Sequence, residues 1–362
     1  DDSQAVNNNI IENKSSYGMF MYGAGYMENS GTIRNTGDSG MYWDVKEGQK
    51  AARIINTQNG VIENTGNYGM YLADSLRLGG FKNTTVINDG IIQNKGDYGF
   101  YINTAGYAIN NGTVRNTGNY ASYVTLMGIM ENNGLMELTG NDKTGMYSLY
   151  GGTSINNGTI KMNGQNTTGM YAYSATIINQ GDIVINGTGK GMAAYKQSHI
   201  ILGSGSTITI NGTEKTYNGE EATGDGVYIY ADETSDINNK GVISSDTRIT
   251  INGEGKFVVN SATGGLSAKR LLLKNNLYID SEIAMDSSED EYLFKNIKTD
   301  EITGDGKIMS DSVLFNAKVD KEDSGYTVAM KRKPFNEVIK KDLGEILEEN
   351  YKNSESDVEK NK

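Results

Sequence analysis

The sequence contains no cysteine, one proline, one histidine and one tryptophan in 362 residues. The absence of cysteine excludes disulfide bonds, thiolate metal sites and cysteine nucleophiles together. No apolar stretch approaches the ~20 residues that a membrane-spanning helix requires. The net charge of −12 gives no general attraction to nucleic acid or to an anionic membrane surface, so we expect no nucleic-acid partner.

Glycine and asparagine are abundant and recur in a phrase close to N-N-G-x-I-x-N-T-G-x-x-G-M-Y. The first glycine of the phrase stands at positions 31, 60, 90, 112, 134, 158 and 181, so the steps are 29, 30, 22, 22, 24 and 23 residues. A self-similar period of about 22 to 24 residues predicts a solenoid, and the two longer steps predict insertions. Because the sequence opens at Asp1 within this pattern and without a methionine, we expect a fragment of a longer chain.

Each copy holds three short strand-like pieces, for example Val114–Asn116, Met170–Ala172 and Ile155–Asn157. Corners rich in Asn and Gly separate them, since these residues tolerate positive φ best. Helices are disfavoured where Asn, Gly and Thr dominate. We therefore predict an all-β fold, a right-handed parallel β-helix with three strands per coil, over residues 1–263.

The residue composition changes towards the C-terminus. Apolar runs such as Leu271–Leu273 and Val313–Phe315 replace the Asn-rich corners, which predicts a β-rich C-terminal cap over 264–332. Pro334 then opens a segment with apolar residues at helical spacing. We predict a short amphipathic helix, ending near Asn350, and a charged, disordered tail within 333–362.

Stacking the copies predicts a register. The column two residues after each repeat glycine is apolar and should face the core: Ile33, Ile62, Ile92, Val114, Met136, Ile160 and Ile183. The next inward column should begin as a hydrogen-bonded asparagine ladder and end apolar: Asn35, Asn64, Asn94, Asn116, Leu138, Met162 and Ile185. The column between them alternates in charge and should stabilise the register on the outer face: Glu12, Arg34, Glu63, Gln93, Arg115, Glu137 and Lys161.

The copies, such as the one over Gly31–Tyr42, resemble the passenger repeats of large type V autotransporter adhesins, particularly the fusobacterial kind. The segment Gly325–Lys333 followed by a helix resembles the end of such passengers. The resemblance implies an extracellular β-helix, on the bacterial surface or released, that binds a protein or glycan receptor on host cells or other bacteria. A membrane would be reached only through a translocator barrel, which this fragment lacks. We expect a monomer without cofactor or metal.

A tyrosine follows the methionine or phenylalanine of most copies, at Tyr42, Tyr71, Tyr101, Tyr123, Tyr147 and Tyr171. Its neighbours on either side, such as Met70 and Leu72, share the inward face, so these tyrosines should form an outward aromatic stripe. Such a stripe offers contact area and hydroxyls to a glycan or a protein. It would also stabilise the solenoid by stacking alone, which is the interpretation we favour from the sequence.

The two insertions, at about 43–52 and 73–84, both follow this strand in consecutive copies and should protrude from one corner. They hold a second set of candidate binding residues: Trp43, Leu76, Arg77, Leu78 and Phe81. Loops on a rigid scaffold commonly bind partners, and Trp and Arg are frequent anchors. Equally, the two insertions could pack against each other as a small local core.

Two other functions remain open. The chain could be a structural stalk that displays a more N-terminal binding domain. It could also be a polysaccharide-active enzyme, which we rank well below an adhesin because Asn and Asp interchange in the acidic column: Asp38, Asn67, Asp97, Asn119 and Asn141. That interchange suits a tight corner. His199 has no evident nucleophile partner and should lie at a strand edge or turn.

Overall fold

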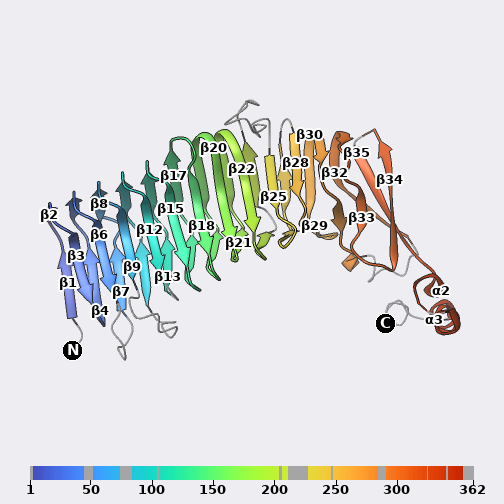
Figure 1. Ribbon diagram of the computed structural model, residues 1–362, viewed down its shortest axis with the longest axis horizontal. Helices are drawn as coiled ribbons and strands as arrows, with labels where there is room; N and C mark the ends of the chain where they lie inside the picture. The colour runs from blue at the N-terminus through green and yellow to red at the C-terminus, as the bar shows by residue number, and fades with distance from the viewer. Residues whose placement is uncertain are drawn as a thin grey trace.

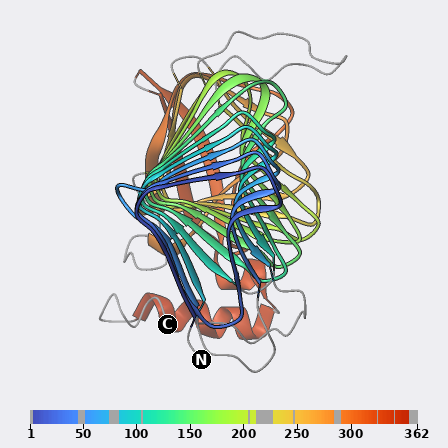
Figure 2. The same ribbon diagram turned by 90° about the vertical axis from the view of Figure 1, so that its left-hand side faces the viewer.

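The computed structural model describes residues 3–44, 52–73, 84–103, 106–203, 206–210, 227–245, 248–283, 291–323, 325–339 and 341–353. Its strands stack side by side along one long axis, from the N-terminal coil to a C-terminal β region followed by helices (Figure 1). Figure 2 looks along this axis and shows the coils superimposed on one another. The predicted all-β solenoid with parallel sheets is therefore confirmed.

Most coils contribute three strands, as predicted, and the strands of the solenoid pair in parallel with their equivalents in the next coil. Tyr107 lies beside Thr85, 22 residues earlier, and beside Ile129, 22 residues later, which confirms the predicted period. The first strands of the coils form one sheet: β1 (Ser3–Asn7), β4 (Gly25–Asn29), β7 (Ala52–Asn56), β10 (Thr85–Asn88), β13 (Tyr107–Asn110), β16 (Ile129–Asn132), β19 (Thr153–Asn156), β21 (Thr176–Asn179), β23 (His199–Leu202), β26 (Asp236–Asn239), β29 (Lys256–Val259), β31 (Leu277–Ile279) and β33 (Ile308–Ser310).

The second and third strands belong to the other sheet. The second strands are β2 (Ile10–Asn13), β5 (Thr32–Asn35), β8 (Val61–Asn64), β11 (Ile91–Asn94), β14 (Thr113–Asn116), β17 (Leu135–Thr139), β24 (Thr207–Ile210) and β27 (Val242–Ser244). The third strands are β3 (Tyr17–Tyr22), β6 (Ser39–Asp44), β9 (Tyr68–Ala73), β12 (Tyr98–Asn103), β15 (Tyr120–Thr125), β18 (Thr144–Leu149), β25 (Val227–Ala231) and β28 (Arg248–Gly253). In four coils one long strand takes both places: β20 (Thr159–Tyr173), β22 (Asp182–Tyr195), β30 (Gly265–Leu273) and β32 (Glu291–Thr303).

The core follows the predicted columns. The apolar column from Ile33 to Ile183 is fully buried. The asparagine ladder also forms: the side-chain amide of Asn35 donates to Asn64 at 2.8 Å, Asn64 donates to Asn94 at 2.8 Å, and Asn94 donates to Asn116 at 3.0 Å. The amide chain satisfies polar groups that would otherwise cost free energy inside the solenoid.

A second asparagine ladder, which was not predicted from the sequence, lies at the C-terminal ends of the strands of the first sheet. Successive side chains donate to the next coil at 2.7–2.8 Å. Its members are Asn7, Asn29, Asn56, Asn88, Asn110, Asn132, Asn156 and Asn179. The signal is visible in the sequence, because one asparagine recurs two residues before each repeat glycine in most copies.

The alternating charge column lies on the outer face as predicted. The Arg34 guanidinium contacts Glu12 at 3.3 Å and Glu63 at 3.0 Å. Glu137 likewise lies between Arg115 at 3.6 Å and Lys161 at 3.0 Å. These pairs are exposed, so each adds only a few tenths of a kcal/mol up to ~1 kcal/mol. Their main effect is to disfavour a slipped register, which would oppose like charges.

Parallel stacking extends past the expected boundary at 263/264. β30 pairs in parallel with β27 and β28, and β31 pairs with both β29 and β33. Antiparallel pairing enters only when β35 (Gly325–Arg332) pairs with β32 and with β34 (Phe315–Glu322). The antiparallel strands thus cover one edge of the second sheet, where a further parallel coil would otherwise be needed.

The predicted helix is present as two pieces, α2 (Phe335–Val338) and α3 (Lys341–Asn353), and Pro334 caps the first. Glu348 of α3 anchors this region, because it accepts hydrogen bonds from both terminal nitrogens of Arg332, at 2.9 and 2.8 Å. The Arg332 guanidinium also lies 3.9 Å from the ring centre of Tyr351. None of the described helices is long and apolar enough to cross a membrane.

Candidate functional site

The predicted tyrosine stripe exists and faces outward. Tyr42, Tyr71, Tyr101, Tyr123, Tyr147 and Tyr171 occupy one register position on six neighbouring strands. All six are half-buried, whereas the residues beside them in each strand, such as Met70 and Leu72, lie in the core. The alternation of strand side chains thus separates core from surface as expected.

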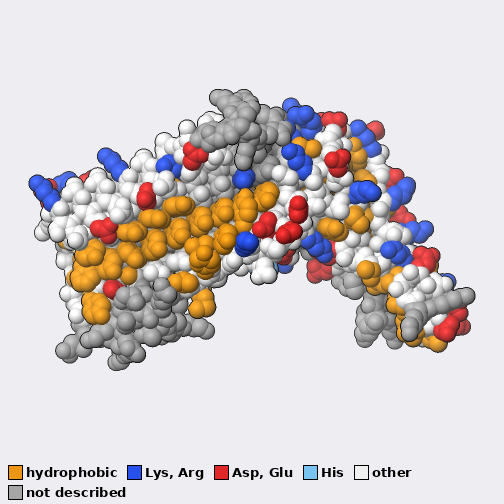
Figure 3. All heavy atoms as spheres, in the orientation of Figure 1, with side chains coloured by type: hydrophobic (Ala, Val, Ile, Leu, Met, Phe, Trp, Pro, Cys, Tyr) orange, Lys and Arg blue, Asp and Glu red, His pale blue; other side chains and the backbone are white. Residues whose placement is uncertain are grey.

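The stripe is part of a longer structure, which we call the aromatic ladder. A parallel column of tyrosines three residues earlier in the strands joins it, and both ends extend it. Consecutive ring centres lie 4.4–5.5 Å apart throughout. Its members are Tyr17, Phe20, Tyr42, Tyr68, Tyr71, Tyr98, Tyr101, Tyr120, Tyr123, Tyr147, Tyr171, Tyr195 and Tyr230. Figure 3 shows a continuous hydrophobic band across this face.

Ring orientation divides the ladder. From Tyr101 through Tyr123 to Tyr147 the rings are nearly parallel, with interplanar angles of 3° and 2°. Each ring face there is covered by its neighbours, so edges and hydroxyls are what remains for a partner. Towards the N-terminus, Tyr71 lies edge-on to both Tyr42 and Tyr101, at 88° and 79°.

The hydroxyls of the stacked part form a row without internal partners. Those of Tyr101, Tyr123, Tyr147 and Tyr171 make no hydrogen bond within the described residues. Burial of the rings raises the pKa of all four phenols, in the case of Tyr171 to about 12. The hydroxyls are therefore neutral at physiological pH, and each can both donate and accept a hydrogen bond.

A polar corner borders the ladder near its N-terminal half. Asn67 donates to Asp38 at 2.8 Å, and Asn119 donates to Asp97 at 2.8 Å. These contacts match the predicted corner role of the alternating Asp and Asn residues. The nearby carboxylate of Asp38 is a secondary cause of the raised pKa of Tyr68, after burial.

Trp43 corrects one prediction. We expected it to begin a protruding insertion, but it lies in β6 with 2% of its surface exposed. Its indole Nε1 donates to the carbonyl oxygen of Gly23 at 2.6 Å. Trp43 pairs with Leu72 and Met21 in neighbouring coils, so it fills the inward column of its strand. It is a core residue and cannot serve as an exposed anchor.

The remaining insertion candidates, Leu76, Arg77, Leu78 and Phe81, lie outside the described residues. The ends from which the insertions leave are described: Asp44 of β6 and Ala73 of β9 are register partners in adjacent strands. Both insertions therefore leave from the C-terminal end of the strands that carry the ladder.

The described residues hold no group of three or more His, Cys, Asp or Glu placed to bind a metal ion. His199 opens β23 and contacts the carboxylate of Asp236, its register partner in β26. This exposed pair lies at the N-terminal end of β23, which pairs with both β21 and β26, so His199 is not on an edge strand.

Comparison with known proteins adds one match. The family model of the BigA beta sandwich domain, a bacterial autotransporter-like adhesin domain, matches residues 252–334. No curated protein and no solved structure matches the chain significantly. The matched segment spans the last parallel coils and the antiparallel strands β34 and β35. Residues 252–334 thus resemble a domain of bacterial adhesin type, and this segment lies at the C-terminal end of a β-solenoid.

Proposed function

We propose that this chain is a non-catalytic segment of a bacterial surface adhesin, and that the aromatic ladder is its binding face. The observation that carries the proposal is the row of neutral hydroxyls on stacked rings between Tyr101 and Tyr171, which have no hydrogen-bond partner among the described residues. A purely structural stack would need the rings alone. The hydroxyls add hydrogen-bonding capacity on the outside, where it contributes nothing to the stack itself.

The ladder suits a protein surface or an extended chain better than flat stacking of single sugar rings. Sugars that bind aromatic residues use the ring face, and in the stacked part the faces are covered by neighbouring rings. Ring edges and hydroxyls that recur with ring centres about 5 Å apart instead suit a partner that lies along the solenoid and makes hydrogen bonds to several coils. The partner is a receptor on host cells or on other bacteria, and the autotransporter origin suggested by the repeats belongs to this proposal.

The experiment compares attachment of the purified chain with that of a variant in which four hydroxyls are removed by Tyr→Phe at positions 101, 123, 147 and 171. Phenylalanine preserves stacking, so the fold is expected to survive while hydrogen bonds to the partner are lost. Attachment to cultured epithelial cells, mucin and bacterial cells is measured by fluorescence of labelled chain. The ladder proposal requires weaker attachment of the variant on at least one of these surfaces.

Two controls separate the alternatives. Tyr278→Phe removes a hydroxyl from the first sheet, away from the ladder strands, and should attach like the native chain. Arg77→Ala tests the insertions. If neither the native chain nor any variant attaches to these surfaces, the result favours the structural stalk. Equal attachment of the native chain and all variants would contradict the ladder as the binding face. Loss with Arg77→Ala alone would move the binding face from the ladder to the insertions.

A further inference from the structure

Three exposed apolar side chains gather at one corner of the solenoid, where the ladder strands β15 and β18 end. Met127 is 61% exposed, Tyr150 is 54% exposed and Ile129, which begins β16, is 38% exposed. Among the described residues between Tyr22 and Val242, no other large apolar side chain is exposed. We call these three residues the apolar corner.

The backbone at this corner makes a tight turn that most side chains avoid. The amide of Gly128 donates to the carbonyl of Thr125 at 3.2 Å. The two residues between them, Leu126 and Met127, have φ angles of 51° and 65°. Positive φ at both central positions of such a turn is the mark of type I′, which favours Asn and Gly. The chain instead places two bulky apolar residues there.

The next coil repeats the turn. The amide of Gly152 donates to the carbonyl of Leu149 at 3.1 Å, and Tyr150 and Gly151 between them have φ angles of 47° and 81°. The side chain of Met127 lies against Gly151. The two turns are therefore stacked, and their exposed side chains are neighbours on the surface.

Folding alone does not explain the bulky residues of the apolar corner. A side chain at positive φ costs conformational free energy that glycine avoids, and the first coil has Gly23 at the equivalent corner, with φ of 90°. Met127 and Tyr150 are mostly exposed, so packing within the described chain offsets little of this cost. Strained residues with exposed apolar side chains indicate a contact with a partner.

The apolar corner adjoins the stacked part of the aromatic ladder. Tyr150 follows Tyr147 by three residues at the end of β18, and its ring meets that of Tyr173 edge-on with the ring centres 5.9 Å apart. Burial raises the pKa of Tyr123 and of Tyr147, and the nearby phenol of Tyr150 is a lesser cause of the same shift. A partner bound along the row of hydroxyls therefore reaches the corner.

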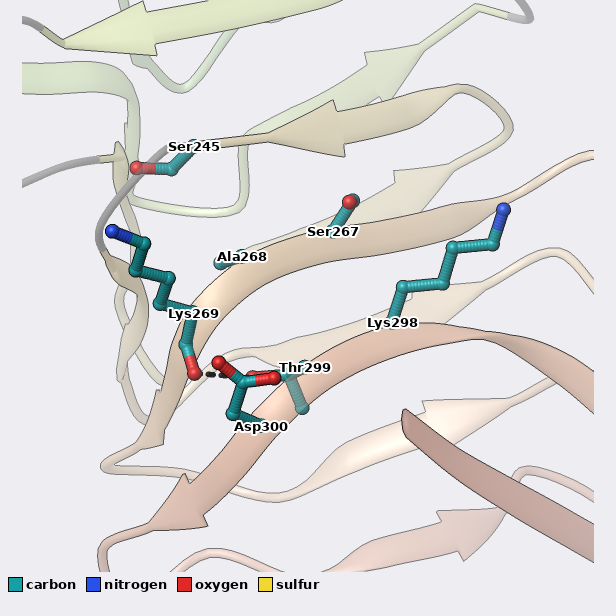
Figure 4. A pocket seen from close by; sticks show the side chains of 7 residues that line it. All are labelled: Ser245, Ser267, Ala268, Lys269, Lys298, Thr299 and Asp300. Atoms are coloured by element: carbon teal, nitrogen blue, oxygen red, sulfur yellow. Dashed lines mark hydrogen bonds between the residues drawn. The ribbon is translucent and has the colours of Figure 1, made fainter. Parts of the chain in front are cut away.

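The main hollow on the C-terminal coils does not offer a comparable anchor. It has a volume of about 560 Å³, and its lining is polar except for Ala268. The side chains of Lys269 and Lys298 extend away from each other there, as Figure 4 shows, so their ammonium groups do not converge on one ligand group.

We propose that the partner of the aromatic ladder is a polypeptide, which places an apolar side chain on the apolar corner while its polar groups bind the row of tyrosine hydroxyls. This inference rests on the proposed function. Met127 and Ile129 carry no strong hydrogen-bonding group for a sugar hydroxyl. Thioether and aliphatic surfaces instead suit apolar protein side chains, and methionine is enriched where proteins meet. A saccharide would leave the corner without a matching surface.

The class of partner is tested on the surface, among epithelial cells, mucin and bacterial cells, to which the native chain attaches most strongly. That surface is treated with proteinase K, which removes polypeptide, or with periodate, which destroys sugar rings. We expect attachment of the labelled chain to be lost after proteinase K and kept after periodate. Loss after periodate would overturn the inference in favour of a saccharide. The ladder itself is still tested separately by the variant that lacks four hydroxyls.

Variants locate the anchor. Met127→Gly and Tyr150→Asn introduce the residues that a type I′ turn favours and remove the exposed side chains. Each should weaken attachment about ten-fold, while the unfolding midpoint stays at the native value or rises because the backbone strain is relieved. Met309→Ala, at another exposed methionine in β33, is the matched control and should attach like the native chain.

Two results would contradict the apolar corner. Native attachment by folded Met127→Gly and Tyr150→Asn would show that the partner does not use it, even if removal of the ladder hydroxyls weakens attachment. A lowered unfolding midpoint in both variants would show that these side chains serve the fold. Weak attachment at a native or raised midpoint supports the inference.

Discussion

Tyr195 stacks on Tyr171, although the strand register pairs Tyr171 with Ala193. The two rings lie 5.1 Å apart, and Tyr195 contacts Tyr230 of the next ladder position at 5.0 Å. Ala193 is fully buried at an outward position. The side chain two residues later therefore covers the small residue and carries the aromatic contact across a coil that lacks its own ring.

This relationship predicts the effect of breaking the ladder at one rung. Tyr195→Ala should expose Ala193 and separate Tyr171 from Tyr230, lowering stability by about 1–3 kcal/mol. Tyr195→Phe keeps the stack and should lie within ~0.5 kcal/mol of the native chain. Hydrogen exchange of the β22 and β25 amides measures the change locally. Equal protection in the Ala and Phe variants would show that stacking contributes little here.

The single tryptophan reports directly on the corrected position of Trp43. Because the indole is buried and hydrogen-bonded to Gly23, its fluorescence should be blue-shifted and protected from quenching by iodide until the coil unfolds. Trp43→Phe should lower stability by about 2–3 kcal/mol, since it leaves a cavity and an unpaired carbonyl. A red-shifted, readily quenched emission in the native chain would show that Trp43 is exposed and would contradict its buried position.

The loss of stability on replacing an asparagine of the first-sheet ladder should depend on where in the ladder that asparagine lies. Asn110→Leu removes the acceptor of Asn88 and the donor to Asn132, both fully buried, and should cost about 2–4 kcal/mol. Asn179→Leu is the matched control at the ladder end, where the next coil already places Leu202. It should cost about half as much. Thermal unfolding midpoints of the two variants provide the comparison, and equal losses would indicate that the ladder acts through packing volume alone.

Acid should release α3 before it unfolds the solenoid. The hydrogen bonds from Arg332 lower the pKa of Glu348 from 4.5 to about 2 in the folded state. A lowered folded pKa stabilises the docked helix fully above the unfolded pKa of 4.5, and this stability is lost as pH falls towards 2. The contribution at neutral pH is on the order of 3 kcal/mol. Limited proteolysis after β35 between pH 5 and about 2 follows the release, and Glu348→Gln should remove its pH dependence.

The periodic features were predictable because each depends on one residue type at one spacing. The inward isoleucines, the ladder from Asn35 to Asn116 and the charges around Arg34 all repeat with the coil. Trp43 was predicted to be exposed because the 29-residue step from Gly31 to Gly60 was interpreted as an insertion that begins at Trp43 itself. Its alignment with Leu72 and Ile102, two residues after the inward Met or Phe, would have placed it in the core.

The features without a period were not predictable. Tyr195 joins the ladder from a position two residues out of register, which depends on side-chain direction over Ala193. The change to antiparallel pairing at β35 likewise follows no sequence period. The replacement of Asn-rich corners by apolar runs after residue 263 did indicate that the structure changes in this region.

The account's central claim is tested most directly by the dissociation constant for one receptor-bearing surface, measured for the native chain and for the variant with Phe at positions 101, 123, 147 and 171. Four lost hydrogen bonds of about 0.5–1.5 kcal/mol each should raise the constant at least ten-fold, while the unfolding midpoint stays close to native. An unchanged dissociation constant in the folded variant would contradict the aromatic ladder as the binding face.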